Sequence, residues 1–216
     1  SLLFPYQIIA ELFSPKEYFS LIGPSFASEI LGKEPTYVNL GYSKRENLGN
    51  IIHLLQTPYF RIEGTSAYQY LELASALKNV YAIASGFAVS IGYKMNTRAF
   101  LITKALQEIT EASRTLHYEC PPLALPGVEG DLILTCFSQE SRNFRFGSYL
   151  ATLSPQEALE KAGATVEGYY TSKSIRELSQ RYGVALPLAS LVEKLIENGN
   201  QSKEHFTKFI ETLGHF

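Results

Sequence analysis

The stretch LELASALKNVYAIASGFAVSI, residues 71–91, determines how the rest of the chain is interpreted. Apolar side chains recur along it at steps of four and three, which is typical of a helix with one face in a protein core. These residues are Leu73, Leu77, Val80, Ala84, Phe87 and Ile91. The other faces carry mostly Ala, Ser, Tyr and Val, so we expect a helix that is buried nearly all round. A membrane span is the alternative, and Lys78 and Asn79 inside the run favour a core helix of a soluble protein.

Lys78 is the one lysine or arginine in this stretch. An ammonium deep in a helical core is unfavourable unless it is paired, and burial lowers the pKa of a lysine because it favours the neutral amine. Such a lysine can serve as a general acid and base at neutral pH. In the alternative interpretation, the stem of Lys78 lies along the core and the ammonium stays in water.

Composition and charge restrict the class of protein. A chain of 216 residues with 45% apolar and 19% charged residues is an ordinary globular composition for one large domain or two small ones. A net charge of −2 predicts no nucleic-acid partner and no anionic membrane surface. Two cysteines, Cys120 and Cys136, are too few for a disulfide scaffold, and the first residues do not resemble a signal peptide. We therefore expect a cytoplasmic protein with no stable membrane insertion.

Up to about residue 64, helices and strands alternate. Helices are expected at 2–13, at 26–31 and after a capping box formed by Ser43 and Glu46, and strands at 19–22, 36–40 and 59–62. This alternation predicts half of a parallel α/β sheet. The chain contains no G-x-G-x-x-G, so the phosphate-binding half of a dinucleotide fold is not predicted within it.

Beyond residue 64 the pattern is helical, and we place a domain boundary there: residues 1–64 as the remainder of an α/β domain and residues 65–216 as an all-helical domain. Asn96 is expected to cap a second long helix whose inner face is Ile102, Leu106, Ile109 and Leu116. A Pro/Gly-rich loop covers 118–130, and Asp131 and Ser141 open the next segments. Further helices are predicted from the Ser154-Pro155 start and over 168–182, 187–198 and 202–213.

Five ordered motifs together resemble the NAD(P)-dependent glycerol-3-phosphate dehydrogenases. They are LIGPSFASE at 21–29, ALKNVYAIA at 76–84 with NTR at 96–98, GDL at 130–132 with TC at 135–136, SRN-x-RFG at 141–147, and VEG at 166–168. The resemblance extends over the chain from about residue 8. It implies a mostly helical chain: the C-terminal half of an α/β Rossmann-type domain, followed by an all-helical domain like that of the 6-phosphogluconate dehydrogenases.

The resemblance also implies an activity, namely hydride exchange between NADH or NADPH and dihydroxyacetone phosphate, which gives sn-glycerol 3-phosphate. Lys78 would be the catalytic proton donor and acceptor. The small phosphate substrate would be bound by Lys78 and six further residues: Gly23, Ser25, Asp131, Ser141, Arg142 and Asn143. Ala27, Arg142 and Glu167 would lie on the cofactor side.

Three of these residues also have a simpler structural interpretation. Asp131 could be an N-cap, Arg142 a solvated residue at a helix start, and Glu167 an acid in the first turn that the helix dipole favours. His53, His117, His205 and His215 show no ligand spacing, so no metal is expected.

The sequence also departs from the family pattern. Ser75 replaces a usual glycine, Met95 a common aspartate, and Glu129 resembles an insertion, while the glycine-rich nucleotide turn and a substrate-binding Lys-Gly pair are not found. We therefore expect a truncated dehydrogenase that is inactive alone, whose exposed sheet edge favours pairing with another chain, such as a homodimer. The alternatives are a non-catalytic helical dimerisation or scaffold remnant, and a related β-hydroxyacid or ketopantoate-type reductase.

Overall fold

The computed structural model describes residues 3–163, 165–197 and 202–212. The chain forms two compact units: the first comprises Ser1–Ser75 and Ser113–Leu134, the second Ala76–Ala112 and Thr135–Phe216. Helices α4, α5 and α6 each begin in one unit and end in the other. This grouping by contacts differs from the domain boundary at residues 64 and 65, which stays a prediction.

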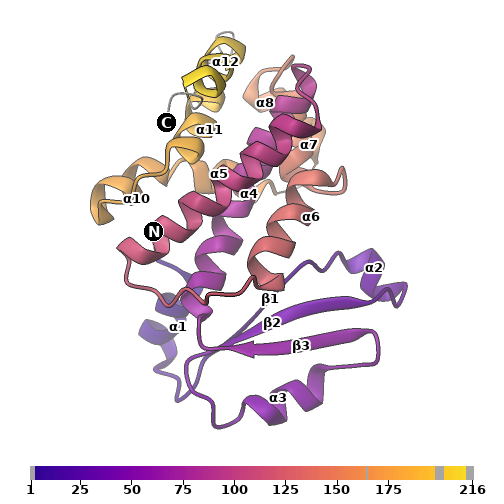
Figure 1. The fold of residues 1–216 in the computed structure, drawn as a ribbon, viewed down its shortest axis with the longest axis vertical. Coiled ribbons are helices and arrows are strands. Elements are labelled where there is room, and N and C mark those ends of the chain that lie inside the picture. Colours follow the sequence, from indigo (N-terminus) through magenta and orange to yellow (C-terminus); the bar gives the residue numbers. More distant parts are fainter. Residues whose placement is uncertain (1–2, 164, 198–201, 213–216) are drawn as a thin grey trace. The chain divides into compact units, whose positions relative to one another are not determined.

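The first unit contains a mixed three-stranded sheet (Figure 1), with strands β1 (Phe19–Ile22), β2 (Thr36–Tyr42) and β3 (Phe60–Thr65) in the order β1-β2-β3. β2 and β3 are parallel, as the alternation predicts, with Thr36 opposite Phe60. β1 runs antiparallel to β2, so the expectation of an all-parallel sheet is wrong for this strand. The connection between the two strands, residues 23–35, contains one short helix, α2 (Ala27–Leu31), of five residues, whereas parallel neighbours are usually joined by a longer crossover helix that packs on the sheet.

The helices of the first unit are α1 (Pro5–Phe13), α2 and α3 (Leu48–Leu55). The predicted capping box at the start of α3 is wrong, because α3 begins after Asn47 with no side-chain cap. The Ser43 hydroxyl accepts a hydrogen bond from the Tyr18 backbone N–H at 2.8 Å, and Asn47 donates to the Glu17 carboxylate at 3.0 Å. The contact with Tyr18 thus holds the Ser43 side chain, which the local pattern had assigned to the helix start.

A buried carboxylate ties α1 and β1 to the beginning of α4 (Tyr68–Ser90). Glu72 is 5% exposed and accepts hydrogen bonds from the Tyr18 hydroxyl and from the Tyr6 backbone N–H. The Tyr6 and Tyr18 rings both pack on the Tyr68 ring. Burial raises the pKa of Glu72 and, together with the hydrogen bond to Glu72, the pKa of Tyr18.

The remaining elements are helical (Figure 1). In chain order after α4 they are α5 (Met95–Thr115), a π-helical turn η1 (Pro126–Gly130), α6 (Asp131–Phe137), α7 (Arg142–Tyr149), α8 (Pro155–Ala162), α9 (Glu167–Ser172), α10 (Ile175–Tyr182), α11 (Pro187–Glu197) and α12 (Ser202–Thr212). This confirms the predicted fold class, a small α/β part followed by an all-helical one. It also confirms α4 as a core helix, since Leu77, Val80 and Phe87 are at most 1% exposed. In the described part of the chain, no helix is long and apolar enough to cross a membrane.

Some helix ends differ from the prediction. α5 already begins at Met95, so Asn96 lies in its first turn instead of capping it. The expected helix 168–182 is two helices, α9 and α10, separated at Lys173 and Ser174. The predicted capping box of α8 is confirmed, with Ser154 and Glu157 bonding reciprocally. The predicted ends at residues 198 and 213 lie outside the described residues.

Within the second unit, α4 and α7 pack backbone against backbone. A Cβ on Gly86 would lie 1.9 Å from the Phe144 carbonyl oxygen, and one on Gly147 would lie 2.0 Å from the Ile83 carbonyl oxygen. Arg98 of α5 stabilises the same region by donating to the Cys136 carbonyl at 3.0 Å, where α6 ends. The NTR motif that contains Arg98 thus has a structural role.

Glu108 on α5 holds the beginning of α11. Its carboxylate is 7% exposed and accepts hydrogen bonds from the Leu188 and Ala189 backbone N–H groups and from the Tyr81 hydroxyl. Those two N–H groups belong to the first turn of α11, where a helix leaves its donors unpaired. Despite these donors, burial raises the pKa of Glu108 from its ordinary 4.5 to about 7.

We expect Glu108→Gln to remove a pH-dependent loss of stability. Between pH 4.5 and about 7, the folded chain keeps a proton on Glu108 that the unfolded chain has released. The contribution of Glu108 to the free energy of unfolding therefore falls as pH rises through this window, by on the order of 3 kcal/mol. Urea unfolding of both proteins at several pH values measures the difference. If the difference in the free energy of unfolding between the two proteins does not depend on pH, or changes with pH in the opposite direction, the raised pKa of Glu108 is contradicted.

Candidate functional site

Lys78 lies on α4 between two residues of the core. Leu77 and Val80 are 1% and 0% exposed, whereas Lys78 itself is half-buried. Of the two interpretations of this lysine, the structure excludes full burial, because its position on the helix faces away from the most buried stripe. A half-buried lysine is held by surrounding packing and still accessible to a small ligand, which suits a group that exchanges protons with a substrate.

The next residue, Asn79, belongs to a hydrogen-bonded chain that joins three of the motifs. Asn143 Nδ2 donates to Asn79 Oδ1 at 2.8 Å, and Asn143 Oδ1 accepts from the Gly168 backbone N–H at 2.8 Å. Because a backbone N–H can only donate, the Gly168 contact fixes the orientation of the Asn143 amide. These two hydrogen bonds thus connect the ALKN helix α4 to the SRN helix α7 and to the VEG turn at the start of α9.

A glycine is required at position 168 of this hydrogen-bonded network because no larger residue fits there. A Cβ at this position would lie 2.4 Å from the Asn79 carbonyl oxygen and 3.0 Å from Asn143 Oδ1. The close approach places the backbone of α9 directly on α4 beside Lys78. The glycine of the VEG motif therefore has a packing reason that the sequence pattern alone does not reveal.

Arg142 and Glu167 form an ion pair at the beginnings of α7 and α9. Arg142 Nη2 lies 3.0 Å from Glu167 Oε1, and the two side chains are 42% and 46% exposed. An exposed pair of this kind contributes little to stability, so both groups can rearrange around a ligand. Arg142 is also the first residue of an eight-residue helix, where unpaired N–H groups and the helix dipole favour an anion.

Ser141 has a structural role in the same place. Its hydroxyl is buried and accepts a hydrogen bond from the Phe144 backbone N–H at 3.2 Å, as the N-cap of α7. Asn143 is likewise buried, at 4% exposure, and occupied by the contacts to Asn79 and Gly168. Both residues hold the end of α7 that presents Arg142.

The first unit holds the predicted residues Gly23, Ser25, Ala27 and Asp131. Packing explains the glycine at position 23, because a Cβ there would lie only 2.6 Å from Val38 Cγ1. The Ser25 hydroxyl donates to the Gly23 carbonyl at 3.0 Å and closes the loop after β1. Ala27 is exposed at the beginning of α2.

This loop contacts the turn that leads to Asp131. The Pro24 ring lies 3.3 Å from the position of a Cβ on Gly130. Asp131 is 3% exposed and follows η1 directly as the first residue of α6. The structure therefore brings the GPS and GDL motifs together within the first unit, although they are far apart in the sequence.

Sequence reasoning missed Asn39, which holds the same turn. This residue of β2 is 0% exposed, and its Oδ1 accepts from the Gly127 backbone N–H at 2.7 Å. Gly127 lies so close to β1 that a Cβ would be 2.7 Å from the Ile22 carbonyl oxygen. A polar Asn between Val38 and Leu40 in an apolar strand was the available signal.

The predicted site residues thus form two groups, one in each unit. Lys78, Ser141, Arg142, Asn143 and Glu167 lie in the second, and Gly23, Ser25, Ala27 and Asp131 in the first. Within the described ranges, no group of three or more His, Cys, Asp or Glu side chains could hold a metal ion.

Comparison with a solved structure defines the class of this fold. The glycerol-3-phosphate dehydrogenase of Coxiella burnetii superposes with a TM-score of 0.90 at 27% sequence identity, over 95% of this chain and 64% of that one. The fold class is thus that of a dehydrogenase whose sheet-containing part is followed by a helical part.

The sequence comparisons narrow this class to a family. A family model described as "NAD-dependent glycerol-3-phosphate dehydrogenase C-terminus" matches residues 69–207. The chain belongs to this family, which confirms the resemblance in the motifs.

Two curated relatives show how much of such a protein the chain represents. The glycerol-3-phosphate dehydrogenase [NAD(P)+] of Paracoccus denitrificans is 36% identical over 192 residues, which are 88% of this chain and 59% of the relative. That of Staphylococcus epidermidis is 39% identical over 186 residues, 85% of this chain and 56% of the relative. The chain therefore spans somewhat more than half the length of these relatives.

Proposed function

We propose that this chain supplies the proton-transferring and phosphate-binding groups for hydride exchange between NADH or NADPH and dihydroxyacetone phosphate. The observation that carries the proposal is the hydrogen-bonded chain from Asn79 through Asn143 to Gly168. It fixes the turn of α4 that carries Lys78 against the helix that carries Arg142. Both groups are partly accessible, as the binding of a small substrate requires.

Lys78 acts as the general acid and base of the reaction. When the carbonyl of the substrate is reduced, negative charge develops on its oxygen, and the Lys78 ammonium donates a proton there. In the reverse direction, the neutral amine accepts the proton of the C2 hydroxyl. The family's nicotinamide cofactor, when bound, supplies or accepts the hydride.

Arg142 binds the phosphate group of the substrate. Its guanidinium can donate two parallel hydrogen bonds to phosphate oxygens, and the beginning of α7 adds a favourable dipole. The buried Ser141 and Asn143 keep this end of the helix rigid. Asp131, Gly23 and Ser25 belong to the same proposal as substrate-binding residues of the first unit.

Ala27, Arg142 and Glu167 are the residues we assign to the cofactor side. This assignment to the nicotinamide cofactor is supported by the Arg142–Glu167 pair, whose two side chains are about half exposed and can each form a hydrogen bond with a polar edge of a nucleotide. The sequence contains no glycine-rich phosphate-binding turn, so in this chain we assign no residue to the pyrophosphate.

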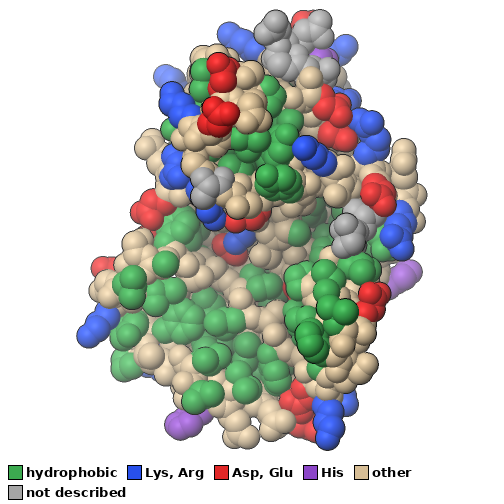
Figure 2. Space-filling model, turned by 180° about the vertical axis from the view of Figure 1, so that it is seen from behind, with side chains coloured by type: hydrophobic (Ala, Val, Ile, Leu, Met, Phe, Trp, Pro, Cys, Tyr) green, Lys and Arg blue, Asp and Glu red, His purple; other side chains and the backbone are tan. Residues whose placement is uncertain are grey.

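We also propose a cytoplasmic location and pairing with a second chain. Cys120 and Cys136 are both free thiols, which fits a reducing compartment. Figure 2 shows broad apolar areas on the surface, and large apolar side chains of the first unit are well exposed, such as Phe13 at 74% and Tyr37 at 60%. Analytical ultracentrifugation should detect a dimer, and a purely monomeric chain would contradict the pairing.

The effect of Arg142→Gln on substrate choice tests the proposed function. We expect the KM for dihydroxyacetone phosphate to rise by about 10- to 100-fold, because a charge-assisted hydrogen bond of about 1.5–3 kcal/mol is lost. The KM for unphosphorylated dihydroxyacetone should not change. The assay follows NADH absorbance with a fusion in which the upstream half of a curated relative precedes this chain. A fusion that consumes no NADH with dihydroxyacetone phosphate would contradict the function, and an unchanged KM would remove Arg142 from phosphate binding.

A further inference from the structure

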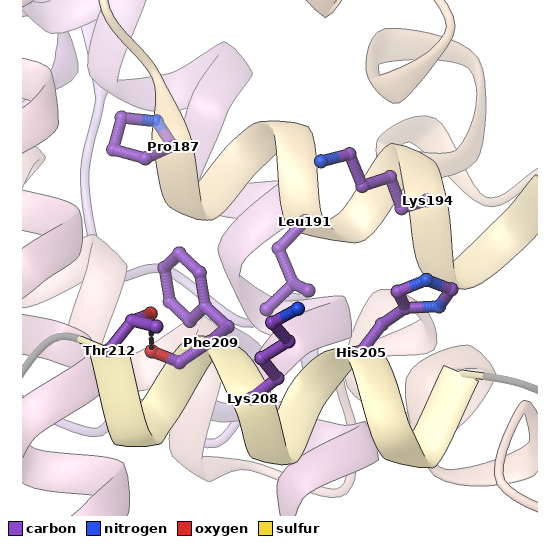
Figure 3. Close-up of a pocket in the computed structure, with 7 residues that line it drawn as sticks. All are labelled: Pro187, Leu191, Lys194, His205, Lys208, Phe209 and Thr212. Carbon is purple, nitrogen blue, oxygen red and sulfur yellow. Dashed lines mark hydrogen bonds between the residues drawn. The ribbon is translucent and has the colours of Figure 1, made fainter.

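A pocket in the helical unit lies between α11 and α12 (Figure 3), and none of the residues assigned to the reaction lines it. It has a volume of about 280 Å³. Its apolar side is formed by Pro187, Leu191 and Phe209, and its polar side by Lys194, His205 and Lys208. We refer to it as the α11–α12 pocket.

The charge of the α11–α12 pocket is of one sign. In Figure 3, Lys208 extends from α12 toward α11, and the His205 ring stands between the two helices. No acidic side chain is among the described residues that line the pocket. Two ammonium groups in one concave site, with no carboxylate among the lining residues, favour a bound anion.

The acidic residues of α11 are directed to a different neighbour. Glu193 and Glu197 form ion pairs with Arg176 of α10 at 3.4 and 3.6 Å. Neither carboxylate lines the α11–α12 pocket. The separation leaves Lys194 as the charged residue that α11 contributes to the pocket.

His205 adds a further hydrogen-bonding group. Its Nδ1 atom is buried and has no hydrogen-bond partner among the described residues. Because this atom is not accessible from the pocket, the imidazole can contribute to ligand binding there only through its other ring nitrogen. The pocket thus offers the Lys194 and Lys208 ammonium groups and one imidazole nitrogen beside an apolar wall.

We propose that the α11–α12 pocket binds a small amphipathic anion, namely a phosphate monoester that carries a short apolar chain. A phosphate dianion matches two ammonium groups and an imidazole better than a carboxylate, which would leave one ammonium unneutralised. The alkyl chain lies against Leu191 and Phe209. The volume corresponds to about nine water-sized groups at ~30 Å³ each. After the phosphate group is accommodated, the remaining space fits a chain of about four carbons.

Butyl phosphate is the probe that tests this proposal on the 216-residue chain. We expect it to bind with a Kd of about 1 mM, as the few atoms of such a ligand allow. NMR signals of the His205 imidazole should shift on titration, and those of His53 and His117 should not. Inorganic phosphate and butanol should each bind at least about tenfold more weakly, because each lacks one half of the interaction. Butyrate should bind more weakly than butyl phosphate.

Two variants and two controls decide the outcome. Lys194→Gln and Lys208→Gln should each weaken binding about tenfold or more. Lys203→Gln removes a charge from α12 outside the pocket and should leave binding unchanged, as should Arg142→Gln, which removes the proposed substrate site. Butyl phosphate binding that is as tight in the Lys194→Gln and Lys208→Gln variants as in the original chain, no shift of the His205 signals, or butanol binding as tightly as butyl phosphate would overturn the proposal. Loss of binding only in the Arg142 variant would assign the ligand to the substrate site instead.

Discussion

Lys78→Ala should lower kcat for the reduction of dihydroxyacetone phosphate by about 10²–10⁴-fold, because this is the typical contribution of a general acid. The substrate should still bind, since Arg142 and the beginning of α7 are unchanged, so KM should vary little. The measurement is steady-state NADH consumption by the fusion with the upstream half of a relative.

Further variants separate proton transfer from charge alone. Lys78→Arg keeps a positive charge but does not release its proton at neutral pH, so it should be nearly as inactive as the alanine variant. Added methylamine should partly restore the activity of Lys78→Ala. Lys94→Ala, which removes an exposed lysine beyond the end of α4, should retain full activity. A Lys78→Ala variant with more than a tenth of the normal turnover would remove Lys78 from the role of general acid.

Gly147→Ala should cause a large loss of stability. Its Cβ would lie 2.0 Å from the Ile83 carbonyl oxygen, which belongs to the backbone of α4. Backbone atoms in a buried helix cannot move aside as a flexible side chain can, so α4 and α7 must separate. We expect a loss of about 4 kcal/mol or more in the free energy of unfolding, enough to unfold a marginal domain.

Gly49→Ala is the matched control for this prediction. Gly49 lies in α3, and an added Cβ there would meet nothing within 4 Å. An alanine in a helix is favoured over glycine by about 0.5–1 kcal/mol, so this variant should be slightly more stable. Urea unfolding followed by circular dichroism compares the two variants with the original chain. Equal unfolding midpoints for Gly147→Ala and the original chain would show that α4 and α7 do not pack as described.

Local patterns predicted the elements of this fold well where neighbouring residues decide the outcome. The stripe from Leu73 to Phe87 defined α4, and the Ser154–Glu157 capping box defined the beginning of α8. The equivalent spacing of Ser43 and Glu46 failed, because Tyr18 binds the Ser43 hydroxyl from another part of the chain. The same pattern therefore has a different outcome when a tertiary partner competes with the local one.

For the candidate site, the sequence proposes which residues belong to it but does not show how they are held in place. The motifs identified Lys78, Arg142 and Asn143 by resemblance, but they gave no reason for Gly168, which only the close contact with Asn79 explains. Long-range partners such as Glu108 with Leu188, or Asn39 with Gly127, leave no periodic trace in the sequence. Such contacts can be identified only in the folded structure.

Transfer of an isotope label tests the central claim most directly. NADH that carries deuterium at the transferable C4 position is supplied with dihydroxyacetone phosphate to the fusion that contains this chain, and the product is analysed by mass spectrometry. We expect one deuterium at C2 of glycerol 3-phosphate and none in the Lys78→Ala reaction above a few percent of that yield. A product without the label, or label transfer that does not depend on Lys78, would contradict the account.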